Sequence, residues 1–276
     1  MRAGFTALLA LCLGVVVAFL TLPIVALFTE APLGDVRSLL GEPAVREAIA
    51  TTARTNAIAN ALILGLGTPA AYLLGTRRFR GRAVVVTLIE LPLVLPPAVA
   101  GIALLAAFGS SGLFGPGLAQ AGIVLPFSEW AVVLAVTFVA SPFYVRQAIS
   151  AFEGVDRTLT DAARTLGASP LRTFARIALP LAAGGLAAGW VLAFARGVGE
   201  FGATILFAGN VRGRTQTLTL AVYEQLEADF DVALSIGILL VVLSAAVLLL
   251  YKLLSHWRSS TWTSPSRFAP SASRPL

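Results

Sequence analysis

Long apolar runs, separated by short polar segments, dominate the sequence. Phe5–Phe28 is a stretch of 24 residues without a charge, and Val232–Tyr251 is a stretch of 20. A helix needs about 20 apolar residues to cross the hydrocarbon core of a bilayer. Runs this long do not alternate as the strands of a membrane barrel do, so helices must be the spanning elements. The pattern predicts an all-α, polytopic membrane protein.

Six spans follow from the apolar runs. They are Phe5–Phe28, about Asn56–Leu74, about Ala83–Phe108, Trp130 to about Val145 with an extension into Ala151, Leu179 to about Gly199, and Val232 to about Leu254. The first run is long for the apolar region of a signal peptide and no clear cleavage site follows, so it is interpreted as a retained helix.

Prolines interrupt the third span. Pro92, Pro96 and Pro97 remove backbone donors there and predict a kink in the helix. Pro96 and Pro97 are candidates for a gate hinge on a translocation pathway, with a static kink as the simpler interpretation.

The basic residues indicate the orientation of the spans. With the N-terminus inside, 14 of the 20 basic residues lie on the cytoplasmic side and five outside, while Arg196 falls within a span. This excess matches the positive-inside rule, so both termini are expected in the cytoplasm. The net charge of +6 reflects these cytoplasmic basic residues, which would face anionic lipid headgroups. No basic domain stands apart from the spans, so nucleic acid is not an expected partner.

The chain divides into a transmembrane domain, residues 1–254, and a polar tail, residues 255–276. The tail is rich in Ser, Pro and Arg and is expected to be disordered and cytoplasmic. Cys12 is the single cysteine and His256 the single histidine, so no metal ligand cluster or disulfide within one chain is expected.

The cytoplasmic loop between the fourth and fifth spans shows signs of order. Thr158, three residues before Asp161, predicts a capping box for a helix over Leu159–Leu166. Gly167 is expected to end that helix, and Ser169 with Pro170 to begin a second one. Leu171, Phe174, Ile177 and Ala178 would share one face of this second helix. The helix pair has two possible roles. It docks to a soluble partner, or its second helix lies on the lipid headgroups.

This loop resembles the EAA loop of ABC-importer permeases, whose pattern is E-A-A-x-x-x-G, nine residues, then I-x-L-P. The matching residues are Asp161, Ala162, Ala163, Gly167, Ile177, Leu179 and Pro180, with Asp in place of Glu at 161. In that family the loop, here about residues 153–179, forms a coupling helix that sits in a groove of the ATPase subunit. The resemblance implies the type I ABC-importer permease fold.

Further segments look like the molybdate-permease branch. They are Arg80–Arg82, Leu91–Pro97, Gly199–Thr204 and Thr215–Leu218. This resemblance implies a homodimer of permease subunits in a bacterial or archaeal plasma membrane, served by an extracytoplasmic binding protein. The implied substrate is a tetrahedral oxyanion, with molybdate or tungstate favoured. The resemblance also implies that ATP and Mg bind a separate ATPase chain. The only lysine, Lys252, follows Tyr251 rather than glycine, so no phosphate-binding loop exists and this chain is not expected to be an enzyme.

Arg196 and Glu200 lie four residues apart on the fifth span and therefore on one helical face. Ionisable residues inside a span are costly and usually face a cavity or each other. A structural pair is the simpler interpretation, and a donor to the passing oxyanion is the alternative. Gly197 and Gly199 are interpreted as close packing at a dimer axis. Glu224, Glu227, Asp229 and Asp231 are expected to form a solvated outer face, with a docking contact to a binding protein as the alternative.

Three other functions remain open. A sulfate or thiosulfate permease shares the charge and shape of the substrate and the same sequence segments. A secondary transporter would need no ATPase, and the helix-glycine-helix loop argues against it. An intramembrane enzyme would need a nucleophile and base or a metal cluster at membrane depth, for which the sequence offers no suitable set.

Overall fold

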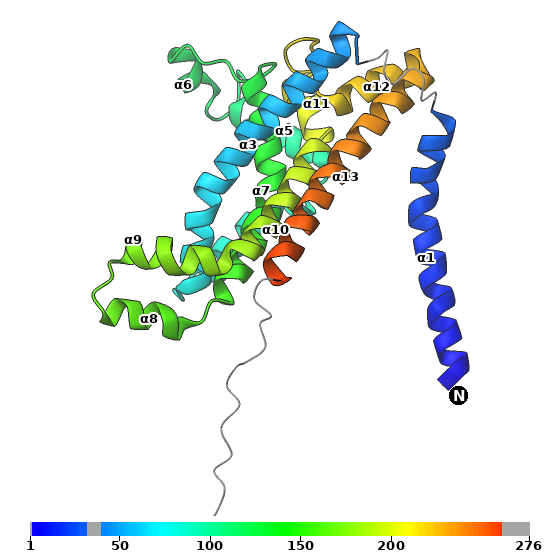
Figure 1. The fold of residues 1–276 in the computed structure, drawn as a ribbon. Helices are drawn as coiled ribbons and strands as arrows, with labels where there is room; N and C mark the ends of the chain where they lie inside the picture. Colours follow the sequence, from blue (N-terminus) through cyan, green and yellow to red (C-terminus); the bar gives the residue numbers. More distant parts are fainter. Residues whose placement is uncertain (1, 32–39, 261–276) are drawn as a thin grey trace, which may run out of the picture.

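The computed structural model describes residues 2–31 and 40–260 of the chain, and in these ranges the fold is all-α (Figure 1). The elements are α1 (Arg2–Glu30), α3 (Pro43–Thr76), α4 (Arg82–Val94), α5 (Pro97–Phe108), α6 (Gly115–Gln120), α7 (Glu129–Glu153), α8 (Arg157–Thr165), α9 (Pro170–Thr173), the π-helical segment η1 (Phe174–Ala178), α10 (Leu179–Val198), α11 (Gly202–Ala208), α12 (Leu218–Ala228) and α13 (Phe230–Ser260).

Five helical segments in the described ranges are long and apolar enough to cross a membrane. They are Gly4–Glu30, Pro43–Thr76, Glu129–Glu153, Pro170–Val198 and Phe230–Leu253. The bent pair α4 and α5 makes a sixth if it counts as one span. The expectation of about six spans is therefore confirmed.

Helix α7 forms the centre of the bundle, with α3 and α10 packed along it (Figure 1). Two glycines permit this close approach. A Cβ at Gly75 of α3 would lie 2.9 Å from the Cβ of Phe152, and one at Gly185 of α10 would lie 2.5 Å from the Cβ of Ala151. Carbon atoms in van der Waals contact lie about 3.5–4.0 Å apart, so larger residues would push these helices off α7. The bundle core thus depends on small residues where its helices meet, as is common in membrane proteins.

The third span is broken where a kink was expected. Helices α4 and α5 meet at an angle of 117°. Leu95 and Pro96 between them have ψ angles of 130° and 136°, which are extended rather than helical. A proline disfavours the helical conformation of the residue before it, and here two successive prolines act on two successive residues. Pro97 then begins α5, where its missing N–H has no cost.

The fifth span is longer than expected, because α9, η1 and α10 join without a break into one helical segment, Pro170–Val198. The sequence had suggested a separate short helix and a new span opened by Pro180. A helix of these 29 residues is about 43 Å long at 1.5 Å per residue. One continuous element therefore connects the loop between α7 and α10 to the far end of the bundle.

The two terminal helices differ from the core helices in their surroundings. Helix α1 stands beside the bundle, and its candidate span has none of its residues buried (Figure 1). Helix α13 continues to Ser260, while its candidate span ends at Leu253, close to the expected end at about Leu254. The remainder of the expected tail, residues 261–276, lies outside the described residues.

Glu224 organises the connection between α11 and α12, although the sequence placed it on a solvated acidic face. Its carboxylate accepts hydrogen bonds from Arg212, from Asn210 at 3.2 Å and from Gln216. These donors stabilise the charged form and lower the pKa of Glu224 below its ordinary value of 4.5, with the hydrogen bond from Arg212 as the largest cause. Through these hydrogen bonds Glu224 holds residues 210–216 against α12.

A lowered pKa predicts that acid loosens this connection. The carboxylate contributes its full stabilisation above the ordinary pKa of 4.5, and the contribution disappears as the pH falls through the lowered value. We expect hydrogen-exchange protection factors of residues 211–217 to fall over that acid range. In Glu224→Gln they should already be low at neutral pH and independent of pH. A wild-type profile that matches the variant would contradict this assignment.

Candidate functional site

The loop between α7 and α10 forms a helical hairpin that projects from one end of the bundle (Figure 1). We call residues 156–179 the coupling hairpin. Its first helix, α8, starts two residues earlier than expected, because Asp156 is the N-cap and accepts a hydrogen bond of 2.9 Å from the Thr158 backbone N–H. The expected capping box with Thr158 as the cap is therefore wrong. The bond from the Thr158 backbone, aided by the Thr158 hydroxyl, lowers the pKa of Asp156.

Gly167 turns the chain between the two helices of the hairpin, as the sequence predicts. Its φ of +83° lies in the left-handed region. The Gly167 N–H donates to the Arg164 carbonyl at 2.9 Å, and the Ala168 N–H donates to the Ala163 carbonyl at 2.9 Å. This pair of bonds is the Schellman motif, which satisfies carbonyls at a helix end. A Cβ at Gly167 would meet no atom within 4 Å, so the requirement for glycine is conformational.

The second helix of the hairpin begins as predicted. Ser169 accepts a hydrogen bond of 3.3 Å from the Arg172 N–H, and Pro170 takes the first helical position. The expected apolar face is partly wrong. Ala178 is buried as expected, but Leu171 is 74% exposed and Thr173 is buried instead. Leu171 lies too near the tip of the hairpin to reach the bundle.

The π-helical segment explains how the hairpin passes into the membrane span without a break. Pro180 has no N–H, and in a regular helix its ring would clash with the carbonyl of Arg176. In η1 the Leu179 N–H instead bonds to the Phe174 carbonyl, five residues back. The wider turn accommodates Pro180, so Ile177, Leu179 and Pro180 of the motif form the junction between hairpin and span.

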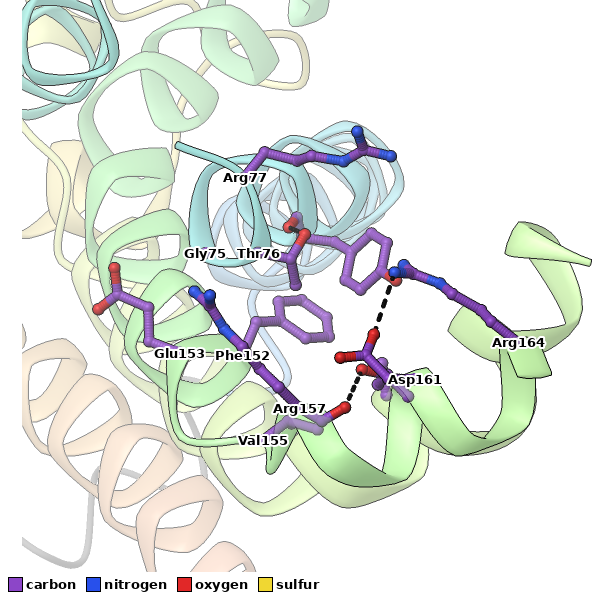
Figure 2. Close-up of a pocket in the computed structure, with 12 residues that line it drawn as sticks. Gly75, Thr76, Arg77, Phe152, Glu153, Val155, Arg157, Asp161 and Arg164 are labelled. Carbon is purple, nitrogen blue, oxygen red and sulfur yellow. Dashed lines mark hydrogen bonds and ion pairs between the residues drawn. The ribbon is translucent and has the colours of Figure 1, made fainter. Parts of the chain in front are cut away.

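Helix α8 is open to solvent and encloses a pocket on its inner side (Figure 2). No residue of α8 is buried. Asp161 lines the pocket, pairs with Arg164 at 3.5 Å, and points towards the end of α3 (Figure 2). Leu166 is 88% exposed, so with Leu171 it gives the hairpin tip two apolar side chains in water.

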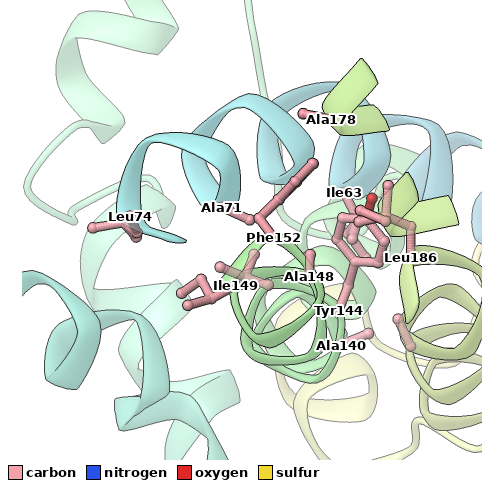
Figure 3. Packing of buried hydrophobic residues seen from close by; sticks show 13 residues of the cluster. Ile63, Ala71, Leu74, Ala140, Tyr144, Ala148, Ile149, Phe152, Ala178 and Leu186 are labelled. Atoms are coloured by element: carbon pink, nitrogen blue, oxygen red, sulfur yellow. The ribbon is translucent and has the colours of Figure 1, made fainter. Parts of the chain in front are cut away.

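Three aromatic rings anchor the hairpin to the bundle. Tyr72 of α3, Phe152 of α7 and Phe174 of η1 have ring centroids 4.7–6.2 Å apart, which is the range of favourable aromatic pairs. Figure 3 shows Phe152 lying between the helices that carry Ala71 and Ala178. No sequence pattern singles out Tyr72 and Phe152, because their contact joins segments far apart in the chain. Movement of the hairpin would therefore reach α3 and α7 as well as α10.

Truncation of this anchor should loosen the hairpin. Phe174→Ala removes one ring from the cluster, and truncation of large core aromatics costs about 3–5 kcal/mol, with this partly buried ring expected near the lower end. We expect a lower thermal unfolding midpoint in detergent and faster proteolysis within residues 156–172. Phe194→Ala, which alters an aromatic pair with Trp190 outside the hairpin, serves as the control. Equal proteolysis of the hairpin in both variants would contradict the anchoring role.

The two charged residues of the fifth span form an ion pair at the end of α10 far from the hairpin. Arg196 Nη2 lies 2.6 Å from Glu200 Oε2. Glu200 is 1% exposed in its side chain, and its other oxygen accepts a 2.7 Å hydrogen bond from the Ala203 N–H at the start of α11. The Glu200 carbonyl accepts a hydrogen bond from Thr219 at 2.8 Å. Glu200 thus links three helices.

Gly197, beside the Arg196–Glu200 pair, packs against α3 and α7 of its own chain. A Cβ there would lie 2.6 Å from Asn56 Oδ1 of α3 and 2.9 Å from a Val136 methyl of α7. The interpretation of Gly197 as a dimer-axis glycine is therefore corrected.

Pro96 and Pro97 lie at the α4–α5 break, where a Cβ at Gly202 would lie 2.6 Å from Pro97 Cβ. The break thus contacts the start of α11, next to the Arg196–Glu200 pair.

Known proteins with related sequences are membrane components of importers. Residues 67–260 match the family of binding-protein-dependent transport system inner membrane components. The molybdenum transport system permease protein ModB of Mycobacterium tuberculosis is 43% identical over 235 residues, which cover 84% of this chain and 88% of that protein. The sulfate transport system permease protein CysT of Salmonella typhimurium is 33% identical over 253 residues, or 91% of each chain.

A solved structure shares the fold. It is the crystal structure of a bacterial alginate ABC transporter in complex with a periplasmic protein carrying an alginate pentasaccharide. The matched chain has a TM-score of 0.75 and 18% identity, with 93% of this chain and 96% of that chain covered. The ABC-importer permease fold expected from the EAA-like loop is therefore confirmed. The chain belongs to the family of binding-protein-dependent transport system inner membrane components.

Proposed function

We propose that this chain is the permease subunit of an ATP-driven molybdate importer. The similarity to ModB over most of both chains favours molybdate over sulfate, for which the similarity is lower. Tungstate has the same charge and shape as molybdate and is a further substrate of this proposal. The permease supplies the pathway, while a separate ATPase binds ATP and Mg and an extracytoplasmic binding protein delivers the oxyanion.

The coupling hairpin is the site at which the ATPase docks. One observation carries this assignment, namely that an exposed hairpin, turned by a left-handed Gly167, continues directly into a membrane span. Force applied to α8 passes through Asp161, Ala162 and Ala163 to the turn and from there along Ile177, Leu179 and Pro180 into α10. The aromatic cluster passes it to α3 and α7. A rigid connection of this kind lets a motor outside the membrane change the packing of several spans together.

The hairpin lies in the cytoplasm in this proposal, and so do both termini. The excess of basic residues on that side supports the orientation. The chain is accordingly a multi-pass protein of a bacterial or archaeal plasma membrane.

The assembly contains two copies of the permease. Helix α1 supports a homodimer, because it is apolar, largely exposed and contacts its own bundle mainly at α13. A second copy would cover part of this surface and lipid the rest. The pathway would run between the copies, near the Arg196–Glu200 pair and the break at Pro96 and Pro97.

Uptake of labelled molybdate into vesicles tests the function. The vesicles contain the permease with its ATPase and binding protein, and sulfate is added as a competitor. We expect uptake to require ATP and to resist excess sulfate. Uptake without ATP would indicate a secondary transporter, and equal competition by sulfate would indicate the sulfate class.

A further inference from the structure

A second cavity lies beside the coupling hairpin, at the same end of the bundle. Its volume is about 550 Å³, and its lining includes Arg77, Arg78, Arg82 and Arg157 with a single acid, Glu153. These residues come from the α3–α4 loop, the start of α4, the end of α7 and the start of α8. The lining therefore has three positive charges in excess.

Arg82 and Glu153 form an ion pair with each other. The Arg82 Nε donates to the Leu74 carbonyl at 2.7 Å, which closes the end of α3, and its Nη2 lies 2.5 Å from Glu153. The side chains of Arg77, Arg78 and Arg157 make no hydrogen bond or ion pair with any residue in the described ranges. Three arginines whose side chains have no partner among the described residues thus line one cavity.

The cavity lies beside an exposed apolar helix face. Phe79 in its wall is 44% exposed, and along the adjoining α4 Val84 is 62% and Leu88 61% exposed. An arginine-lined cavity next to an open apolar helix face suits a molecule with an anionic head and an acyl chain. Guanidinium groups match the oxygens of a phosphate group by paired hydrogen bonds.

We propose that Arg77, Arg78 and Arg157 bind a tetrahedral oxyanion group at this position. The phosphate of an anionic phospholipid, with its acyl chains along α4, has this chemistry. A free oxyanion on the cytoplasmic side has the same shape and charge. This site is separate from the import pathway, and its existence does not depend on which oxyanion is imported.

The site touches the coupling hairpin. Arg77 and Arg157 also line the 300 Å³ pocket under α8, where Arg157 is directed from the start of α8 towards Phe152 and Glu153 (Figure 2). A bound anion would therefore tie the α3–α4 loop to the first residue of α8. Its occupancy would restrain the element through which the ATPase acts.

The assembled transporter in lipid nanodiscs provides the test. We compare the wild type with the variant Arg77→Gln, Arg78→Gln, Arg157→Gln, and use Arg80→Gln as the matched control. Arg80 is an exposed arginine of the same loop that lines neither cavity. One arm measures phosphatidylglycerol retained by the complex by native mass spectrometry. The other measures labelled molybdate or phosphate bound at equilibrium in phosphatidylcholine nanodiscs without binding protein.

We expect the triple variant to bind one of the two probes at least about tenfold more weakly, and Arg80→Gln to bind it as the wild type does. Loss in the phosphatidylglycerol arm assigns the site to lipid, and loss in the other arm assigns it to a free oxyanion. Equal binding of both probes by all proteins would overturn the proposal, as would equal losses in Arg80→Gln. If the triple variant does not assemble, Arg77→Gln, Arg78→Gln replaces it, with the same two outcomes.

Discussion

Replacing Gly167 with proline is expected to abolish ATP-driven import while leaving the membrane bundle folded. Proline holds φ near −65°, whereas Gly167 has a φ of +83° and donates a hydrogen bond to Arg164. A misfit of this kind costs about 3 kcal/mol or more, or roughly a hundredfold in the population of the native turn. The second helix of the hairpin would leave its present direction, and the docking surface would be lost.

A graded series separates this effect from general damage. Gly167→Ala should reduce import several-fold, because a left-handed alanine costs about 1–2 kcal/mol. Gly167→Asn should approach wild-type import, since asparagine tolerates this conformation. Gly184→Ala is the control, because that helical glycine has open space around it. Import by wild-type amounts in Gly167→Pro, with the ATPase still co-purifying, would refute the coupling role.

Removal of Arg196 is expected to produce the largest loss of stability in the bundle. Arg196→Ala leaves Glu200, 1% exposed in its side chain, without its 2.6 Å partner. Removal of one member of a buried ion pair typically costs about 3–5 kcal/mol, because a buried charge remains uncompensated. We expect a sharply lower unfolding temperature and loss of the assembled complex.

The paired replacement Arg196→Leu, Glu200→Leu distinguishes a structural pair from a residue on the pathway. If the pair is structural, the double variant should recover most of the stability lost by Arg196→Ala and should import molybdate. If Arg196 is a donor to the passing oxyanion, the double variant should assemble and hydrolyse ATP without import. Stability of Arg196→Ala equal to that of the wild type would contradict the ion-pair account itself.

The sequence predicted the local features of the coupling hairpin well. Gly167, Ser169 and Pro170 determine backbone conformation through their own side chains or lack of one, so their roles can be inferred without a structure. The helix start was misassigned because the capping-box pattern at Thr158 drew attention away from Asp156, two residues earlier. Only the hydrogen bond between them shows that Asp156 is the cap.

Features that depend on three-dimensional packing were not predictable in the same way. Prolines indicated a disturbance near residue 96, but the angle of 117° depends on where α5 packs against α11. The continuity of α9 with α10 requires a π turn, which hydrophobic periodicity does not reveal. The contact of Phe174 with Tyr72 joins positions a hundred residues apart, and no local pattern indicates such a pair.

Accessibility of the hairpin tip tests the account most directly. The single cysteine, Cys12, is replaced by serine, and Leu166→Cys at the exposed tip then provides one target for a membrane-impermeant maleimide. The account predicts labelling from the cytoplasmic side of the membrane only, and protection of the cysteine when the ATPase subunit is bound. Labelling from the outside, or equal labelling with and without the ATPase, would contradict it.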